Sequence, residues 1–558
     1  MLIGTRQIDP SNLPSQNWVN QHLVYTHGIG VAVVAANTVD SATGNPIFEV
    51  GNIPTTSTGG LPVLTEPDVY FGLNQSGWVV ADSKQPELDY QVNTGANAGT
   101  PVYTHYRGGG GVPVGGLFSR LALALRLGNF NFLISNQITS TSRVMFVRDV
   151  RQMVKQAAPF LSFDSKAYPV IANGHVDYVL NGYTTTAQYP YSENADLLTP
   201  GVGGLPSSFN YVRDSVVAVV DSYTGSIHFY VIHPSDPIIQ AYRSAFPTLF
   251  EPMSAMPVTI RDHLRYPSDL LSVQAAVLGR YHITGASSFY AASDRWEVTP
   301  TTGAGSPASL ISSTQLVASN GQVIGTQLSP MSPIYQVGAL PNSTGQQLLA
   351  MLDFVPAGNS SRVQGLSAIL AATSDPNDYG QLNVYETPRG TTVTGPLQAD
   401  SEIQQNSKVS SIITPLDQHG SQVLLGNNLT VPLDSSVLYI RPLYVTSTSN
   451  PMPELRYVIA VFNQQVGIEP TLAGALGDVL GPAARAVGGS GSTGSSTTPA
   501  GGSTAPAAAS VAGELQRAAA AYAAAQSALA AGDLGAYQRD VEAMDQAIQA
   551  AQNALGKG

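Results

Sequence analysis

The 558-residue chain contains no cysteine, which excludes structural disulfides, thiolate zinc sites and cysteine nucleophiles. A cysteine-free chain suits an oxidising compartment, because no stray thiol can mispair, and it suits a cytoplasm almost as well. Charged residues are also scarce, at 11% against roughly 25% in typical soluble proteins. The polar surface is therefore built mainly from uncharged side chains, a composition that favours a location outside the cytoplasm.

Basic runs and long apolar runs are missing as well. The net charge is −12, and no Lys/Arg cluster offers the basic footprint of a nucleic-acid partner, so we expect none. The same balance argues against docking on anionic lipid head groups by charge. No window reaches the roughly 18 apolar residues that span a bilayer, and the first ten residues lack a signal-peptide core. An extracytoplasmic chain would need an export signal or anchor upstream of Met1.

The residues that are present predict a multi-part globular region. Hydrophobic residues make up 43% of the chain, enough for a core, and the length predicts two to four folding units. Short strand-like runs separated by Gly, Pro and Asn outnumber helical patterns. We predict an α+β fold, predominantly β, over residues 1–480, which allows two subdomains with a boundary near 290–330.

The end of the chain has a different composition. Residues 487–512 are almost all Gly, Ser, Thr, Ala and Pro, which predicts a flexible linker. Residues 513–556 are Ala-rich with apolar side chains at heptad spacing, so we predict an antiparallel helical hairpin that turns near Gly532. Such a hairpin has little core of its own. We expect it to dock on its own subunit or on a neighbour; a loosely helical tail that touches nothing is the alternative.

One hairpin stands out in the folded region. Residues 168–172 and 175–180 are rich in β-forming residues, and Asn173-Gly174 between them is typical of a tight type I′ turn. The Tyr- and Thr-rich stretch 182–192 that follows predicts an ordered loop over a sheet. A second hairpin is expected over 211–232.

Helices are predicted at four places, and later strands at five. The helices cover 116–127, 142–158, a segment that Asp236 caps and that runs to about Ala245, and 268–281 with Ser268 as its cap. The strands are expected at 367–372, 381–386, 423–425, 437–445 and 455–464.

Several blocks together resemble the Uncharacterised Protein Family 0182. The blocks are NWVNQHLVYTHGIG (17–30), VRDVRQMVKQAAPFLSFDSKAYPVI (147–171), GYTTTAQYPYS (182–192), NYVRDSVVAVVDSYTGSIHFYV (210–231), RYPSDLLSVQAAVLGRYHI (265–283) and LYIRPLYV (438–445). The resemblance implies large membrane proteins, mainly actinobacterial, with several transmembrane helices followed by a large domain outside the membrane. This chain is similar only to that second, C-terminal part. The family has no established activity, so no catalytic residue carries over.

Candidate ligand contacts come from three patterns. His22 and His27 are spaced five apart, which fits neither one helix face nor one strand face, so we favour hydrogen bonding over a metal pair. A Gly-rich run before residues 117–127 lacks the Lys-Ser/Thr of a phosphate loop, leaving a mobile loop or an anion lid. The residues that remain as candidates are His22, His27, Gly109, Gly110, His175, Asp177, Tyr183, Tyr189 and Tyr191.

The sequence is compatible with three functions. The first is a non-catalytic extracytoplasmic domain of an envelope membrane protein, serving assembly or the passage of a lipid or solute. The second is an envelope hydrolase or transferase, in which a pair such as His175 and Asp177 supplies a base. The third is a glycan-binding module that uses exposed Tyr rings. We expect a membrane connection through an upstream segment, a homo-oligomer, a lipid or glycan ligand, no cofactor and no metal.

Overall fold

The computed structural model describes most of the chain up to residue 481. The residues outside the description are 58–60, 62, 93–97, 196–202, 301–304, 306–312, 318–322, 342, 344, 359–364, 389, 434–435, 448–451 and all beyond 481 except Arg539, Ala543 and Gln546. The chain divides into two compact units, Met1–Gly489 and Ser490–Gly558. The predicted linker and nearly all of the helical hairpin lie outside the described residues. Of the hairpin, only the three tail residues named above are seen, each helical.

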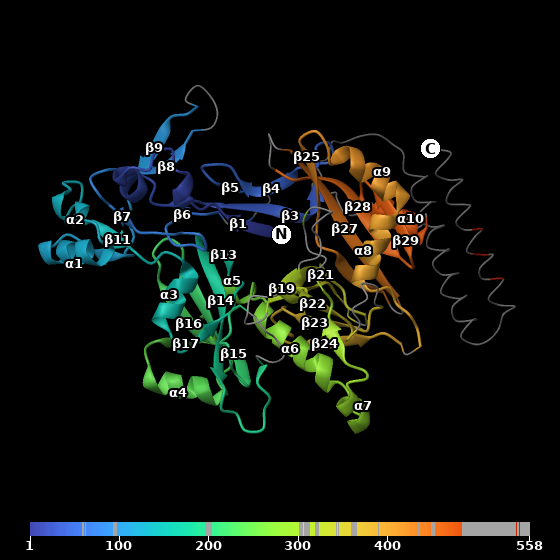
Figure 1. Ribbon diagram of the computed structural model, residues 1–558. Coiled ribbons are helices and arrows are strands. Elements are labelled where there is room, and N and C mark those ends of the chain that lie inside the picture. The colour runs from blue at the N-terminus through green and yellow to red at the C-terminus, as the bar shows by residue number, and fades with distance from the viewer. Residues whose placement is uncertain are drawn as a thin grey trace. The chain divides into compact units, whose positions relative to one another are not determined.

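The first unit is a β-rich α+β structure, as predicted, with several separate sheets that are antiparallel except for one parallel pair (Figure 1). A subdomain boundary near 290–330 stays a prediction. None of the described helices combines the length and the apolar composition that a bilayer-spanning segment requires.

Four small sheets form the N-terminal third. Their strands are β1 (Leu2–Thr5), β3 (Val31–Val39), β4 (Pro46–Gly51) and β5 (Thr56–Ser57); β2 (Gly28–Ile29) and β6 (Asp68–Val69); β10 (Val112–Pro113), β11 (Arg143–Met145) and β7 (Val79–Ala81); and β8 (Glu87–Gln91) and β9 (Pro101–Thr104). The short helices here are η1 (Pro10–Asn12), the π-helix η2 (Asn20–Val24), α1 (Leu117–Leu127) and α2 (Asn131–Ile134).

The turn between β3 and β4 reaches a strand from the far end of the described chain. The Leu455 amide donates a hydrogen bond to the Gly44 carbonyl over 2.9 Å. A Cβ atom at Gly44 would lie 2.2 Å from the Leu455 carbonyl oxygen. Glycine is therefore required at this close approach of two backbones.

The central sheet runs in the order β12-β14-β15-β16-β17, with β13 also paired to β14. Its strands are β12 (Ser162–Phe163), β13 (Tyr168–Ala172), β14 (His175–Thr186), β15 (Tyr211–Asp221), β16 (Ile227–Val231) and β17 (Phe250–Pro252). Helices α3 (Val150–Ala157) and α4 (Pro237–Ala245) pack on one face, and α5 (Val258–Arg261) packs on the other. Because both faces are covered, consecutive residues are buried along most of β14 and β15.

The predicted hairpin is confirmed, and the loop after it is partly wrong. Asn173 and Gly174 have φ values of 51° and 81°, the left-handed values that a type I′ turn needs. The stretch 182–186 is strand, because β14 continues through a bulge after Gly182 and pairs with β15. Pairing on both sides therefore outweighs the turn-like composition of GYTTT.

The predicted helices are confirmed except one. Helix α6 covers Ser268–Tyr281, but its cap is Pro267 rather than Ser268. Asp236 caps α4, accepting from two backbone amides, and Pro237 is its first residue. The helix predicted over 142–158 is wrong in its first half, where residues 143–145 form β11. Asp149 caps the remainder, α3.

Two further sheets form the C-terminal half and confirm the five later strands. One sheet holds β18 (Trp296–Val298), β21 (Ile334–Gly338), β22 (Gln347–Pro356), β23 (Ala368–Thr373) and β24 (Leu382–Glu386); the other holds β25 (Ser421–Leu425), β26 (Leu429–Leu433), β27 (Ser436–Ser447), β28 (Glu454–Phe462) and β29 (Gln465–Glu469). A separate hairpin is β19 (Ser313–Val317) with β20 (Val323–Leu328). The remaining helices are α6, η4 (Met253–Ala255), α7 (Ala286–Ala291), α8 (Pro396–Gln405), α9 (Ser407–Leu416) and α10 (Leu472–Leu480).

Candidate functional site

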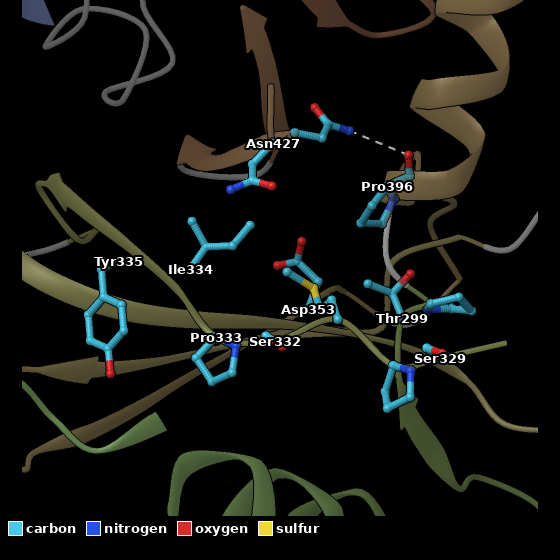
Figure 2. Close-up of a pocket in the computed structure, with 13 residues that line it drawn as sticks. Thr299, Ser329, Ser332, Pro333, Ile334, Tyr335, Asp353, Pro396 and Asn427 are labelled. Atoms are coloured by element: carbon cyan, nitrogen blue, oxygen red, sulfur yellow. Dashed lines mark hydrogen bonds between the residues drawn. The ribbon is translucent and has the colours of Figure 1, made fainter. Parts of the chain in front are cut away.

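A cavity of about 610 Å³ lies where residues of the two C-terminal sheets meet. Its lining comes from the segments after β18, before β21 and between β25 and β26, together with β22 and the start of α8. The lining residues are Thr299, Pro300, Ser329, Pro330, Met331, Ser332, Pro333, Ile334, Tyr335, Asp353, Pro396, Asn427 and Asn428. Figure 2 shows the Asp353 carboxyl in their midst, with Ile334 on one side and Thr299 on the other.

Asp353 is the one carboxyl among these lining residues. It lies on β22, on the strand face opposite Leu352 and Phe354, and it is 2% exposed. Its Oδ2 accepts a hydrogen bond from the Thr430 hydroxyl of β26 over 2.5 Å. Burial raises the pKa of Asp353 to about 6, an effect that the Thr430 hydrogen bond only partly offsets. The group therefore changes charge close to neutral pH.

Three buried oxygens at the cavity have no hydrogen-bond partner among the described residues. They are Asp353 Oδ1, Thr299 Oγ1 and Asn428 Oδ1. The Asn428 amide nitrogen is used, since it donates to the Pro396 carbonyl over 3.5 Å (Figure 2). Buried polar atoms are nearly always paired with protein or water, so three unpaired oxygens at one cavity mark a site that awaits hydrogen-bond donors.

The rest of the wall is largely apolar. Four prolines and the side chains of Met331 and Ile334 supply C–H surface between the polar atoms. A few polar groups set in an apolar wall is the usual build of a small-molecule site, and the volume falls in the usual range of about 300–1,000 Å³. The arrangement can hold a molecule that offers several hydroxyl or N–H donors and one apolar face.

A second buried polar cluster surrounds Glu87 in the N-terminal third. Glu87 is fully buried and accepts hydrogen bonds from the Thr26 hydroxyl, the Tyr70 hydroxyl at 2.7 Å, and the amides of Asp82 and Tyr106 at 2.9 and 3.1 Å. Burial alone would raise the pKa of Glu87. The His27 imidazole and these donors outweigh burial, so the pKa lies below its usual value.

The structure separates the two histidines that the sequence singled out. His22 stacks on Trp78 with ring centroids 3.6 Å apart, and its Nδ1 lies 2.8 Å from the Trp78 carbonyl oxygen. His27 instead contacts Thr26 and lies 3.7 Å from Asp68. Each ring has its own surroundings, consistent with the expectation that these two residues do not form a pair.

The Gly-rich loop is held by an arginine. The Arg143 guanidinium donates hydrogen bonds to the carbonyls of Gly109, Gly110 and Gly111. The Gly110 amide donates to the Tyr106 hydroxyl over 2.7 Å. The loop carbonyls thus face a cation, which is the opposite of an anion-binding loop, where amides face the ligand.

The structure places His175, suggested with Asp177 as a source of a catalytic base, next to a different carboxylate. His175 Nδ1 lies 3.3 Å from Asp221 Oδ2, so its nearest carboxylate is across the sheet. Asp177 is paired directly opposite Asp221 in the ladder. Burial, and then the Asp221 charge, raise the pKa of Asp177 to about 7. Both candidates lie at the β13–β14 turn end of the central sheet.

The three tyrosines fall into two environments. Tyr183 is fully buried in β14 and donates to Asp164 Oδ2 over 2.5 Å, so it cannot contact a ligand at the surface. Tyr189 and Tyr191 lie in the loop after β14 and are exposed. Tyr189 stacks against Tyr211 with centroids 5.7 Å apart. None of the nine sequence candidates is among the lining residues of the cavity.

Sequence reasoning missed the cavity residues, although Asp353 carried a signal. It is a lone acid within the apolar run LLAMLDFVP, and a charge inside a buried strand needs a partner or a function. Thr299 and Asn428 carried no such signal, since threonine and asparagine are ordinary residues in loops. Their convergence on Asp353 depends on how two sheets pack.

Comparison with protein families matches residues 1–416 to the Uncharacterised protein family (UPF0182). Among curated relatives, UPF0182 proteins from Moorella thermoacetica, Cupriavidus necator and Geobacter sulfurreducens are 36%, 38% and 35% identical to this chain. The alignments cover 86%, 85% and 86% of this chain and 49% of each relative, so the chain spans about half the length of the curated relatives it matches. No solved structure matches it.

These relatives come from several bacterial phyla, which corrects the expectation of a mainly actinobacterial family. That the chain corresponds to the C-terminal part alone stays a prediction. The family matched along most of the chain is the one that the sequence blocks resemble. The chain belongs to the uncharacterised protein family UPF0182.

Proposed function

We propose that this chain is a non-catalytic, ligand-binding region of a bacterial envelope membrane protein, and that it receives a small polyhydroxylated solute in the cavity around Asp353. The observation that carries the proposal is the set of three unpaired buried oxygens, Asp353 Oδ1, Thr299 Oγ1 and Asn428 Oδ1. A sugar-like molecule supplies several hydroxyl donors at once and can place its C–H face against the prolines.

The lining supports binding rather than hydrolysis. Glycoside hydrolases usually place two carboxyl groups about 5–10 Å apart across the bond they cleave. The described lining residues include one carboxyl, Asp353. The envelope hydrolase or transferase is therefore the less favoured alternative.

The binding proposal is tested by calorimetric titration of the full chain with neutral mono- and disaccharides at pH 7.5. Thr299→Val keeps the shape but removes one acceptor, and we expect about 3–10-fold weaker binding. Asp353→Asn should weaken it further. Asp214→Asn is the matched control, because burial raises the pKa of Asp214 to about 8 and that residue is also buried, outside the cavity lining. Equal affinities in all four proteins, or no binding at all, would overturn the proposal.

A second function, docking on a lipid bilayer, is favoured by a separate surface. Helices α1 and α2, which lie side by side in Figure 1, expose large apolar side chains: Leu117, Phe118, Leu121, Leu125, Phe130 and Ile134. The opposite face of α1 buries Leu123 and Ala124 in the core. A helix that is apolar on both faces needs a second apolar environment.

The local charge fits a membrane with anionic lipids. Residues 90–148 contain five Arg and neither Asp nor Glu. Arg148 is buried, and the other four give this stretch a positive sign despite the overall charge of −12. Attachment through an upstream segment, an extracytoplasmic location in the cell membrane and a homo-oligomeric state belong to the same proposal, and the family resemblance supports them. Juxtaposed basic and apolar residues are typical of surfaces that lie on bilayers.

Vesicle co-sedimentation tests the docking. The full chain should pellet with vesicles of mixed neutral and anionic phospholipid, and Phe118→Ser with Leu125→Ser should abolish pelleting. Val337→Ser is the control, since Val337 is an exposed apolar residue on β21, outside the α1–α2 surface. Unchanged pelleting of the double variant would show that the apolar side chains of α1 do not mediate docking.

A further inference from the structure

We propose that His27, Asp68 and Asp89 form a binding site for one divalent transition-metal ion, of which Zn²⁺ and Mn²⁺ are the best-suited examples. The three residues come from separate elements: His27 precedes β2, Asp68 lies on β6 and Asp89 lies on β8. β2 and β6 are paired, with Ile29 opposite Asp68. One ligand atom from each residue lies within 4.8 Å of the other two.

Hydrogen bonding fixes which nitrogen of His27 faces the carboxylates. The Thr26 hydroxyl donates its proton to Glu87, so its oxygen accepts from His27 Nδ1 over 2.9 Å. Glu87 has no proton to give, since it accepts from four donors. Nδ1 therefore carries a ring proton, and in the neutral imidazole Nε2 presents a lone pair. A carboxylate that orients a histidine in this manner is a common support of metal-binding histidines.

His27 Nε2 lies close to the carboxylate oxygens of Asp68 and Asp89. His27 is 2% exposed, and its Nε2 has no hydrogen-bond partner in the part of the chain that is described. Asp68 Oδ1 lies 3.7 Å away, too far for a hydrogen bond. Asp89 Oδ1 is likewise buried and unpartnered. When the imidazole is neutral, these three atoms are all electron-pair donors with no proton between them, which leaves room for a cation.

The distances and the ligand types suit a transition metal. Zinc binds imidazole nitrogen and carboxylate oxygen at about 2.0–2.2 Å in a tetrahedron, so its ligand atoms lie about 3.3–3.6 Å apart. The 3.7 Å between Nε2 and Asp68 is close to this range, so a small inward shift of either side chain would seat the ion. A set of one imidazole and two carboxylates suits Zn²⁺ or Mn²⁺, whereas Ca²⁺ and Mg²⁺ prefer oxygen alone. Water can complete the coordination on the Asp89 side, which is half-buried.

The test uses the full chain, stripped with a chelator and titrated with ZnCl₂ and, separately, MnCl₂ by calorimetry. We expect one high-affinity ion per chain for at least one of the two metals, and at least tenfold weaker binding in Asp89→Asn. Asp89 is chosen because it is the least buried of the three ligands, so its replacement disturbs the core least. Asp82→Asn is the matched control: it removes a nearby charge whose only ion-pair neighbour among the described residues is His105.

Two outcomes would overturn the site. Equal binding by the wild type, Asp89→Asn and Asp82→Asn would show adventitious binding at surface groups. No binding by the wild type, with a ¹⁵N shift of His27 that shows protons on both nitrogens, would show that an imidazolium occupies the place of the ion. Melting temperatures of the metal-free proteins establish that each variant is folded.

Discussion

Two buried carboxyls in this chain, Glu87 and Asp353, behave in opposite ways. Both are almost completely inaccessible, yet the pKa of Glu87 lies below its usual value and that of Asp353 is raised to about 6. Glu87 accepts four hydrogen bonds, and Asp353 accepts one from Thr430 and turns its other oxygen to a cavity. The neighbouring His27 and the number of donors, rather than burial alone, therefore set the pKa. A saturated carboxyl holds structure together, and an unsaturated one is available to a ligand.

The comparison predicts its largest effect at Glu87. Glu87→Gln replaces one accepting oxygen with an NH₂ group that must face an amide or hydroxyl donor. We expect the free energy of unfolding to fall by about 3–5 kcal/mol, the usual result of breaking a buried charged network. Urea denaturation measures it, with Glu402→Gln on α8 as the control, because Glu402 keeps one oxygen without a partner. A loss below about 1 kcal/mol, as for an ordinary surface change, would contradict the comparison.

The pH dependence of Asp353 gives the next largest effect. Its folded-state pKa of about 6 exceeds the ordinary 3.8, so the folded protein holds this proton more tightly than the unfolded chain. The stability it contributes is complete below pH 3.8 and is lost as the pH rises through 6. Asp353→Asn should therefore gain about 2.4 kcal/mol relative to the wild type between pH 4 and pH 8. Denaturation at several pH values checks this.

Thr299→Val is the control for that series, since it should follow the wild-type pH profile. A difference between Asp353→Asn and wild type that does not change with pH would mean that Asp353 is not the titrating group.

The Asn173-Gly174 turn contains no titratable group, so a substitution there measures backbone strain without electrostatics. At Gly174, φ is +81° and an added Cβ would meet Thr65 Oγ1 at 2.2 Å. Gly174→Val should destabilise by about 1–3 kcal/mol at every pH. Lys166→Val, in the loop between β12 and β13, serves as a neutral comparison. A melting temperature equal to that of the wild type would show that the turn relaxes.

The smallest effect is expected at Thr299. Its hydroxyl has no partner in the described structure, so Thr299→Val should change the unfolding free energy by less than about 0.5 kcal/mol. Thr430→Val removes the donor of Asp353 and should cost about 1–2 kcal/mol. Equal losses for the two variants would show that the Thr299 hydroxyl is satisfied in solution.

Local patterns predicted the elements well where one short-range signal dominates. The Asn173-Gly174 turn, the Asp236-Pro237 helix start and α6 follow from residues next to each other in the chain. The strand over 143–145 was missed because Val144 and Val147 fit a helical period, whereas pairing with β7 and β10 determines the outcome. Pairing partners distant in sequence leave no local signal.

The candidate sites depended even more on distance in sequence. Asp353 meets Thr299 and Asn428 only after two sheets have packed, and His27 meets Asp68 and Asp89 only when β2, β6 and β8 assemble. The spacing between His22 and His27 indicated only whether these two residues could bind one metal together. It carried no information on ligands from other strands. A charged residue in an apolar run, as in LLAMLDFVP, is the one signal that sequence alone could have used.

The backbone hydrogen bond between Gly44 and Leu455 has a consequence for the order of folding. During synthesis at roughly 5–20 residues per second, the β3–β4 turn waits on the order of tens of seconds for its partner strand to emerge. In a truncated chain that ends before β28, the Gly44 carbonyl would lack its Leu455 donor. Such long-range closure predicts slow folding and makes the nascent N-terminal sheet a natural client for a chaperone.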